Sequence, residues 1–218
     1  LLLCAVDDGD FIWAGGSGLV KINKATGSIQ FFNKANSGLP NNYVKAVAKD
    51  NNNSIWVGTH NGVANFSTLS REWIVFDTSN SLLPSNTVSD ICVTSHGVWI
   101  ATAAGLVHKK DNQWVVYNSS SGFPFNYATA VAGDSLSVWV GSAYGAIAEI
   151  KVNATDGRWF LHYGENKESS AISSISVNQD EVWVAKSFDG LLKYDGQKWR
   201  EFTTNNSGLP SNSVNTIF

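Results

Sequence analysis

The chain alternates short apolar runs with polar turns. The apolar residues are mostly β-branched or aromatic, and Asn, Asp, Gly or Ser bounds each run. Strands joined by hairpin turns have this composition. No apolar stripe with the 3.6-residue period of a helix persists along the sequence. The pattern therefore predicts an all-β protein.

One apolar pattern occurs five times. It places a tryptophan between two apolar residues, and successive tryptophans are 43, 43, 40 and 44 residues apart. A glycine with an apolar neighbour follows in most copies, and a further pair of large apolar residues, mostly aromatic, comes later in each copy. A period of this length indicates one supersecondary unit that stacks on its neighbours. The repeated residues are Trp13, Trp56, Trp99, Trp139 and Trp183.

Each copy reads as four short strands, with the tryptophan on the second strand. A four-stranded sheet has two apolar faces, and a ring of sheets buries both of them. We therefore predict that residues 1–218 form a single β-propeller domain or fragment with five complete four-stranded blades and one tryptophan wedged at each seam. The expected blades cover about residues 1–36, 43–80, 87–121, 127–167 and 171–206.

Residues 214–218 repeat the first strand of a blade after five complete copies. A closed ring of five blades has no place for this strand, so we expect a larger ring of six to eight blades. The alternative is that the strand pairs with another chain. Further blades or a second chain are thus the partners expected at residues 214–218.

The charge balance narrows the partners further. Charged residues make up 15% of the chain, the net charge is −3, and the longest basic cluster is Lys109-Lys110. Nucleic acids need a concentrated positive face, so we predict no nucleic-acid binding.

The longest wholly apolar run, residues 1–6, is too short for a membrane span. It could be the tail of a secretory signal, but the repeat places it on a strand, and we predict no membrane insertion within this chain.

The repeat resembles the two-component regulator propeller family. The matching segments are Gly208-Leu209-Pro210-Ser211-Asn212-Ser213-Val214, Ile55-Trp56-Val57-Gly58-Thr59 and Gly190-Leu191-Leu192-Lys193-Tyr194-Asp195. The resemblance implies a seven-bladed ring in the periplasmic part of hybrid sensor kinases, many of them tied to polysaccharide use. The same repeat occurs in secreted proteins without kinases. We therefore expect a periplasmic or extracellular location.

Residues that break the repeat are the candidates for ligand binding. In a propeller, the connectors between blades and the loops after the tryptophan strands share one face around the channel mouth. There the sequence mixes aromatic faces with a few polar groups, as small-ligand sites do; ordinary loop variation is the alternative. The candidates are Tyr43, His60, Phe125, Tyr127, Tyr144, Lys186, Phe188 and Asp189.

Catalytic and metal-binding patterns are absent from the sequence. The segment Asp7-Asp8-Gly9-Asp10 resembles a calcium loop but lacks the bidentate glutamate. We predict no metal, no cofactor and no catalytic residue. The first hypothesis is a sensory module that binds an oligosaccharide or a protein ligand. The second is a structural or protein-interaction module, and the third is a carbohydrate-active enzyme.

Overall fold

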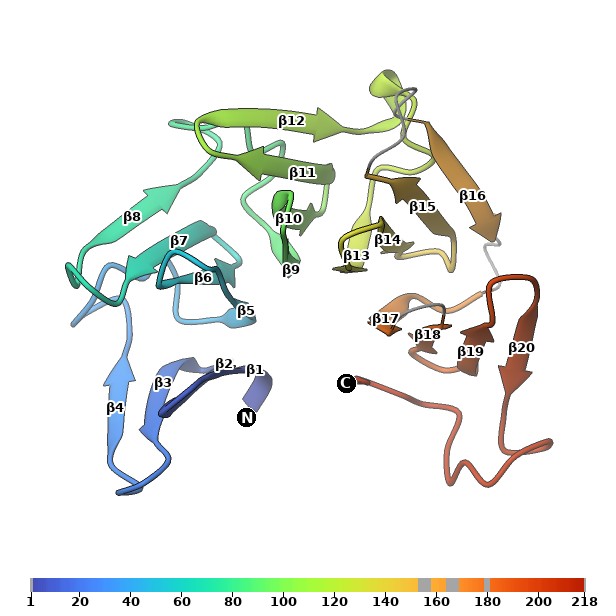
Figure 1. Ribbon diagram of the computed structural model, residues 1–218, viewed down its shortest axis with the longest axis horizontal. Helices are drawn as coiled ribbons and strands as arrows, with labels where there is room; N and C mark the ends of the chain where they lie inside the picture. The colour runs from blue at the N-terminus through green and yellow to red at the C-terminus, as the bar shows by residue number, and fades with distance from the viewer. Residues whose placement is uncertain (1, 153–157, 164–168, 179–180, 218) are drawn as a thin grey trace.

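The computed structural model describes residues 2–152, 158–163, 169–178 and 181–217 (Figure 1). These residues form five antiparallel sheets, each made of four strands that follow one another in the chain. The described helical structure is a single 3-10 turn at Ser119–Ser121. The prediction of an all-β protein is therefore confirmed.

The strands of each sheet run in chain order from the inside of the molecule to its rim. The first two sheets are β1 (Leu2–Asp8), β2 (Phe11–Gly16), β3 (Gly18–Asn23), β4 (Ile29–Phe32), and β5 (Val44–Lys49), β6 (Ser54–Thr59), β7 (Gly62–Ser67), β8 (Trp73–Phe76). The third is β9 (Val88–Thr94), β10 (Gly97–Thr102), β11 (Gly105–Lys110), β12 (Gln113–Tyr117). The last two are β13 (Ala128–Gly133), β14 (Ser137–Ser142), β15 (Ile147–Lys151), β16 (Trp159–Tyr163), and β17 (Ile172–Asn178), β18 (Glu181–Lys186), β19 (Gly190–Tyr194), β20 (Trp199–Phe202). Part of the predicted fourth blade, at residues 153–157 and 164–167, lies outside the described residues.

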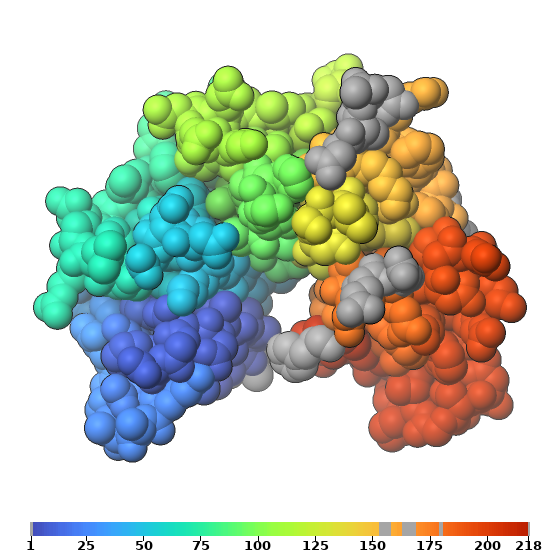
Figure 2. Space-filling model, viewed as in Figure 1, coloured from blue at the N-terminus to red at the C-terminus, as the bar shows by residue number. Residues whose placement is uncertain are grey.

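The five sheets stand side by side as blades of an arc (Figure 1). The inner strands β1, β5, β9, β13 and β17 contact one another in that order around a central channel. An opening separates the first blade from the fifth (Figure 2). The fold is thus a β-propeller whose five blades form an open arc of a larger ring, whereas the total number of blades stays a prediction.

Four tryptophans fill the seams between consecutive blades. Trp99 is 2% exposed and packs against Val138 and Val140 of the following blade. Trp13, Trp56 and Trp139 occupy the equivalent places at the other three seams. Trp183 lies on the side of the fifth blade that faces the opening, where it is only half-buried beneath Lys193.

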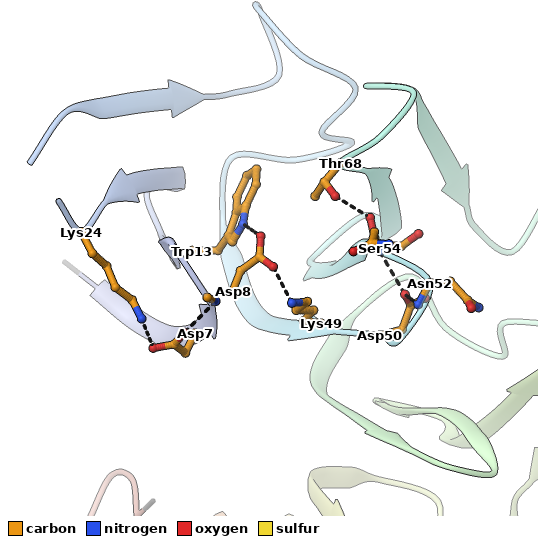
Figure 3. A network of polar contacts seen from close by, with 11 residues as sticks. Asp7, Asp8, Trp13, Lys24, Lys49, Asp50, Asn52, Ser54 and Thr68 are labelled. Carbon is orange, nitrogen blue, oxygen red and sulfur yellow. Dashed lines mark hydrogen bonds and ion pairs between the residues drawn. The ribbon is translucent and has the colours of Figure 1, made fainter. Parts of the chain in front are cut away.

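A carboxylate at the turn between β1 and β2 links the first blade to the second. The indole N–H of Trp13 donates to Asp8, whose other oxygen lies 2.6 Å from Nζ of Lys49 on the next blade (Figure 3). Asp7 pairs with Lys24 within the first blade. These two carboxylates of the calcium-like segment therefore hold lysines and an indole. The described residues contain no cluster of three or more side chains suited to a metal ion.

Gly62 marks the tight turn between β6 and β7. Its φ of +104° is unfavourable for other residues, and an added Cβ would lie 2.4 Å from the carbonyl oxygen of Phe76. We expect Gly62→Ala to lower the free energy of unfolding by about 1–3 kcal/mol in chemical denaturation. Gly208→Ala is the control, because its Cβ would meet no atom within 4 Å. Equal effects of the two substitutions would contradict this explanation.

Residues 214–217 lie beside the fifth blade, and the assignment of residues 214–218 to the first strand of a further blade stays a prediction. The segment docks against β17 and the end of β18: Ser173 Oγ donates to the Val214 carbonyl at 2.6 Å, and Val214 N donates to the Lys186 carbonyl at 3.4 Å. Residues 214–217 nevertheless form no strand, and Phe218 lies outside the described residues. A strand of a sheet is defined by its ladder to another strand, and none of the described strands forms a ladder with residues 214–217.

Candidate ligand-binding site at the channel mouth

A β-bulge occurs at the same place in every inner strand. The register of each ladder shifts by one residue near the start of β1, β5, β9, β13 and β17. A bulge leaves its extra residue unpaired and re-aims the side chain. Here the extra residues turn toward the channel. We call them the bulge ring: Leu3, Lys45, Ser89, Thr129 and Ser173.

The bulge ring lines one cavity of about 880 Å³, together with Tyr43, Asp90 and Ser187. This volume falls in the range of pockets that hold small ligands, roughly 300–1,000 Å³. A second hollow of about 370 Å³ is lined largely by apolar residues of the same inner strands, such as Val47 and Val131. The larger cavity contains the bulge ring, and the smaller one lies against other residues of the same inner strands.

Hydroxyl groups of the bulge ring link neighbouring blades. Thr129 Oγ1 donates to the carbonyl of Ile172 on the next blade at 2.7 Å. Ser173 Oγ donates to the carbonyl of Val214 at 2.6 Å. Each hydroxyl donates its hydrogen bond to a backbone carbonyl, and its oxygen can still accept a hydrogen bond. These oxygens can thus accept hydrogen bonds from a ligand in the cavity.

Asp90 and Lys45 bring charge to the cavity. The two carboxylate oxygens of Asp90 accept hydrogen bonds from the backbone N–H groups of Ile91 and Val131, both at 2.9 Å. Burial raises the pKa of Asp90 to about 6, although these N–H groups and the charge of Lys45 oppose the rise. Lys45 is exposed in the cavity and forms no hydrogen bond or ion pair with any residue that the structure describes.

The structure brings some of the predicted site residues together. Tyr43 lines the cavity with 42% of its surface exposed, and its ring centroid lies 4.3 Å from that of His60. Tyr127 and Tyr144 are also exposed, and the Tyr127 carbonyl accepts from the loop that carries Tyr144, at Ala143 N. These aromatic side chains therefore belong to the same connectors and loops.

Lys186 and Asp189 hold a loop in place. Lys186 is buried, with its Nζ 3.3 Å from an Asp189 oxygen that also accepts from the N–H and hydroxyl of Ser170, both at 2.8 Å. The N–H of Ser170 is the main cause that lowers the pKa of Asp189. Phe188, between the two, is 72% exposed. The charged pair thus positions the loop, and Phe188 is left free to meet a ligand.

Phe125 requires a correction. It is 3% exposed, and its ring centroid lies 4.5 Å from that of Phe123 in the core between the third and fourth blades. The connector directs this side chain inward, away from the channel mouth. Phe125 therefore stabilises a seam and does not face a ligand.

Sequence reasoning missed the bulge ring. The signal lies in the aligned inner strands, where Val44-Lys45-Ala46 corresponds to Ala128-Thr129-Ala130. Both have a polar residue between two small apolar ones. Strict alternation would have placed that residue on a blade face, and only the bulge turns it toward the channel.

Residues 38–61 match the family model of the two-component regulator propeller. The resemblance inferred from the repeat is thereby confirmed for that segment. No curated protein matches the sequence significantly.

Solved structures share the fold at low identity. The extracellular domain of the B. thetaiotaomicron one-component system BT4673 matches with a TM-score of 0.80 and 20% identity, over 100% of this chain and 30% of that one. The extracellular domain of hybrid two-component system BT3049 of the same organism gives 0.74 and 19%, over 99% and 30%. PorZ, a surface component of the type-IX secretion system of Porphyromonas gingivalis, gives 0.73 and 19%, over 100% and 36%. The chain thus spans about a third of each of these structures.

Proposed function

We propose that this chain, which carries the two-component regulator propeller repeat, belongs to a sensory module outside the cytoplasm and binds its ligand at the channel mouth. The observation that carries the proposal is the bulge ring, which gathers polar side chains from consecutive blades in one cavity. Similar propellers in extracellular domains of B. thetaiotaomicron signalling systems support a periplasmic or extracellular location. None of the described residues forms a helix with the length and hydropathy of a membrane span.

An oligosaccharide fits the chemistry of this mouth. The exposed rings of Tyr43, Tyr144 and Phe188 offer flat apolar faces, and the hydroxyl oxygens of Thr129 and Ser173 offer acceptors. A sugar ring has apolar C–H faces and many hydroxyl donors, so it can use both kinds of group. A few polar groups among aromatic faces are typical of small-ligand sites.

Binding without catalysis is the simpler reading of the cavity. Glycosidases generally use a pair of carboxyl groups. Among the described residues that line the cavity, Asp90 is the sole carboxylate. Both of its oxygens are already engaged by backbone N–H groups. The groups in the cavity therefore favour a receptor over a hydrolase.

Loss of an exposed aromatic ring should weaken ligand binding. We expect Tyr144→Ala or Phe188→Ala to raise the dissociation constant of a bound oligosaccharide at least about tenfold, which corresponds to ~1.4 kcal/mol. A glycan array followed by calorimetric titration would measure this. Leu69→Ala is the control, because Leu69 is exposed in a hairpin turn away from the mouth. Silence across a broad array from a folded protein would contradict the proposal.

A protein-interaction module is the second candidate function. The first blade exposes Ile29 and Phe31 on its outer strand β4, and PorZ, a similar propeller, is a surface component of a secretion system. Apolar surface of this kind can mark a protein interface. Size measurement with light scattering distinguishes the two functions, since a stable monomer that binds saccharide argues against this candidate.

A further inference from the structure

We infer that the channel mouth takes an acidic oligosaccharide, whose anionic group binds the ammonium of Lys45. This inference rests on the proposed function and names the class of ligand for the same site. It follows from the place of Lys45 in the bulge ring, the absence of an ion pair between Lys45 and any described carboxylate, and the groups around it.

Lys45 is the one charged member of the bulge ring. The other four positions hold Leu3, Ser89, Thr129 and Ser173, which are neutral. Since all five positions share one backbone geometry, the lysine is not needed to form the bulge. The bulge therefore does not require a cation at this position, and the charge of Lys45 acts on nearby Asp90 and on any anionic group that enters the cavity.

Five lysines of the described ranges form ion pairs with carboxylates, whereas Lys45 is among those that do not. Within the described ranges, Lys45 has no carboxylate oxygen within ion-pair distance. The lysines that do form ion pairs are Lys24, Lys49, Lys151, Lys186 and Lys193. The ammonium of Lys45 is therefore available in a cavity of ligand size.

Asp90 does not take the role of that partner. Its oxygens face the backbone N–H groups of Ile91 and Val131, which fix the carboxylate between β9 and β13. Burial raises the pKa of this group to about 6, so the carboxylate is mostly ionised at neutral pH and its charge acts on nearby Lys45. Since the backbone N–H groups hold Asp90, an anionic ligand group can form a charge-assisted hydrogen bond with the Lys45 ammonium, and such bonds are about twice as strong as neutral ones.

The surroundings favour a hydroxyl-rich anion over a simple one. Thr129 and Ser173 have given their protons to carbonyls of the neighbouring blade or segment. Their remaining capacity is to accept, which suits the hydroxyl donors of a sugar. Tyr43, two residues before Lys45, adds an exposed ring that is able to cover a sugar face. The anionic group can be a uronic-acid carboxylate or a sulfate ester, because an ammonium binds both.

Calorimetric titration with matched saccharides tests the inference. The probes are neutral, uronic-acid-containing and sulfated oligosaccharides of equal length, with the protein in low and high salt. We expect at least one acidic probe to bind at least about tenfold more tightly than its neutral counterpart, and Lys45→Gln to remove that advantage. Lys45→Arg should keep most of it. Lys110→Gln is the control, since Lys110 is exposed at the opposite end of β11 from the mouth. Whichever acidic probe binds, the uronic-acid-containing or the sulfated oligosaccharide, identifies the anionic group.

Two results would overturn the inference, and they differ in what they say of the proposed function. If neutral and acidic probes bind equally, or if Lys45→Gln leaves the affinity for the acidic probe unchanged, the anionic group of the ligand does not bind Lys45. If Tyr144→Ala still weakens that binding, the proposed function stands. Binding of no probe by a protein with an unchanged circular-dichroism spectrum overturns both.

Discussion

Trp99→Ala is expected to lower the free energy of unfolding by about 3–5 kcal/mol, as for other large buried aromatic residues. The indole is 2% exposed, stacks on His108 at 3.9 Å between centroids, and fills the seam between the third and fourth blades. Its removal leaves a cavity between two sheets, which cannot close without moving a blade. Urea denaturation followed by circular dichroism measures the loss.

Trp183→Ala is the matched control for this prediction. Trp183 occupies the same position in its blade, but it is only half-buried. We expect its replacement to cost less than about 2 kcal/mol, because little packing is lost. If the two substitutions destabilise the protein equally, seam packing is not the main role of the repeated tryptophan.

Asp90 should make the stability of the protein fall as the pH rises. Burial raises its pKa in the folded protein from 3.8 to about 6. The contribution of the protonated group is then complete below about pH 3.8 and lost as the pH rises through about 6, where the buried group ionises. The loss amounts to about 3 kcal/mol, at about 1.36 kcal/mol for each pH unit between the two values.

Asp90→Ala provides the comparison, since the neighbouring blades carry Ala46 and Ala130 at this position. Unfolding free energies of both proteins would be measured from about pH 4 to about pH 7. We expect wild type to lose stability relative to the variant by up to about 3 kcal/mol over this range. Parallel curves for the two proteins would show that Asp90 does not titrate as its burial implies.

The fold could be predicted because its largest side chains recur. The indoles repeat at nearly constant spacing, and a sheet with two apolar faces has few ways to bury both. The glycine after each tryptophan strand also repeats for a local reason, which Gly62 illustrates through its positive φ. These signals depend on residues close together in the chain, so pattern analysis detects them.

The site was predicted less well because it depends on the direction of single side chains. Tyr43 and His60 do meet at the channel mouth, but Phe125 turns into the core from an equivalent connector. Lys45 reaches the channel only through a bulge, and the polar residue between two apolar ones that marks this bulge also fits ordinary strand alternation. Lys186 and Asp189 are near the mouth but are held by Ser170 and each other.

Amide hydrogen exchange with and without a bound saccharide tests most directly whether the channel mouth is the ligand site. The account predicts slower exchange in residues 41–45, in residues 187–189 and at the start of β13, with the outer strands β4, β8 and β12 unchanged. Slower exchange confined to those outer strands would contradict it, as would an unchanged pattern at a saturating concentration of ligand.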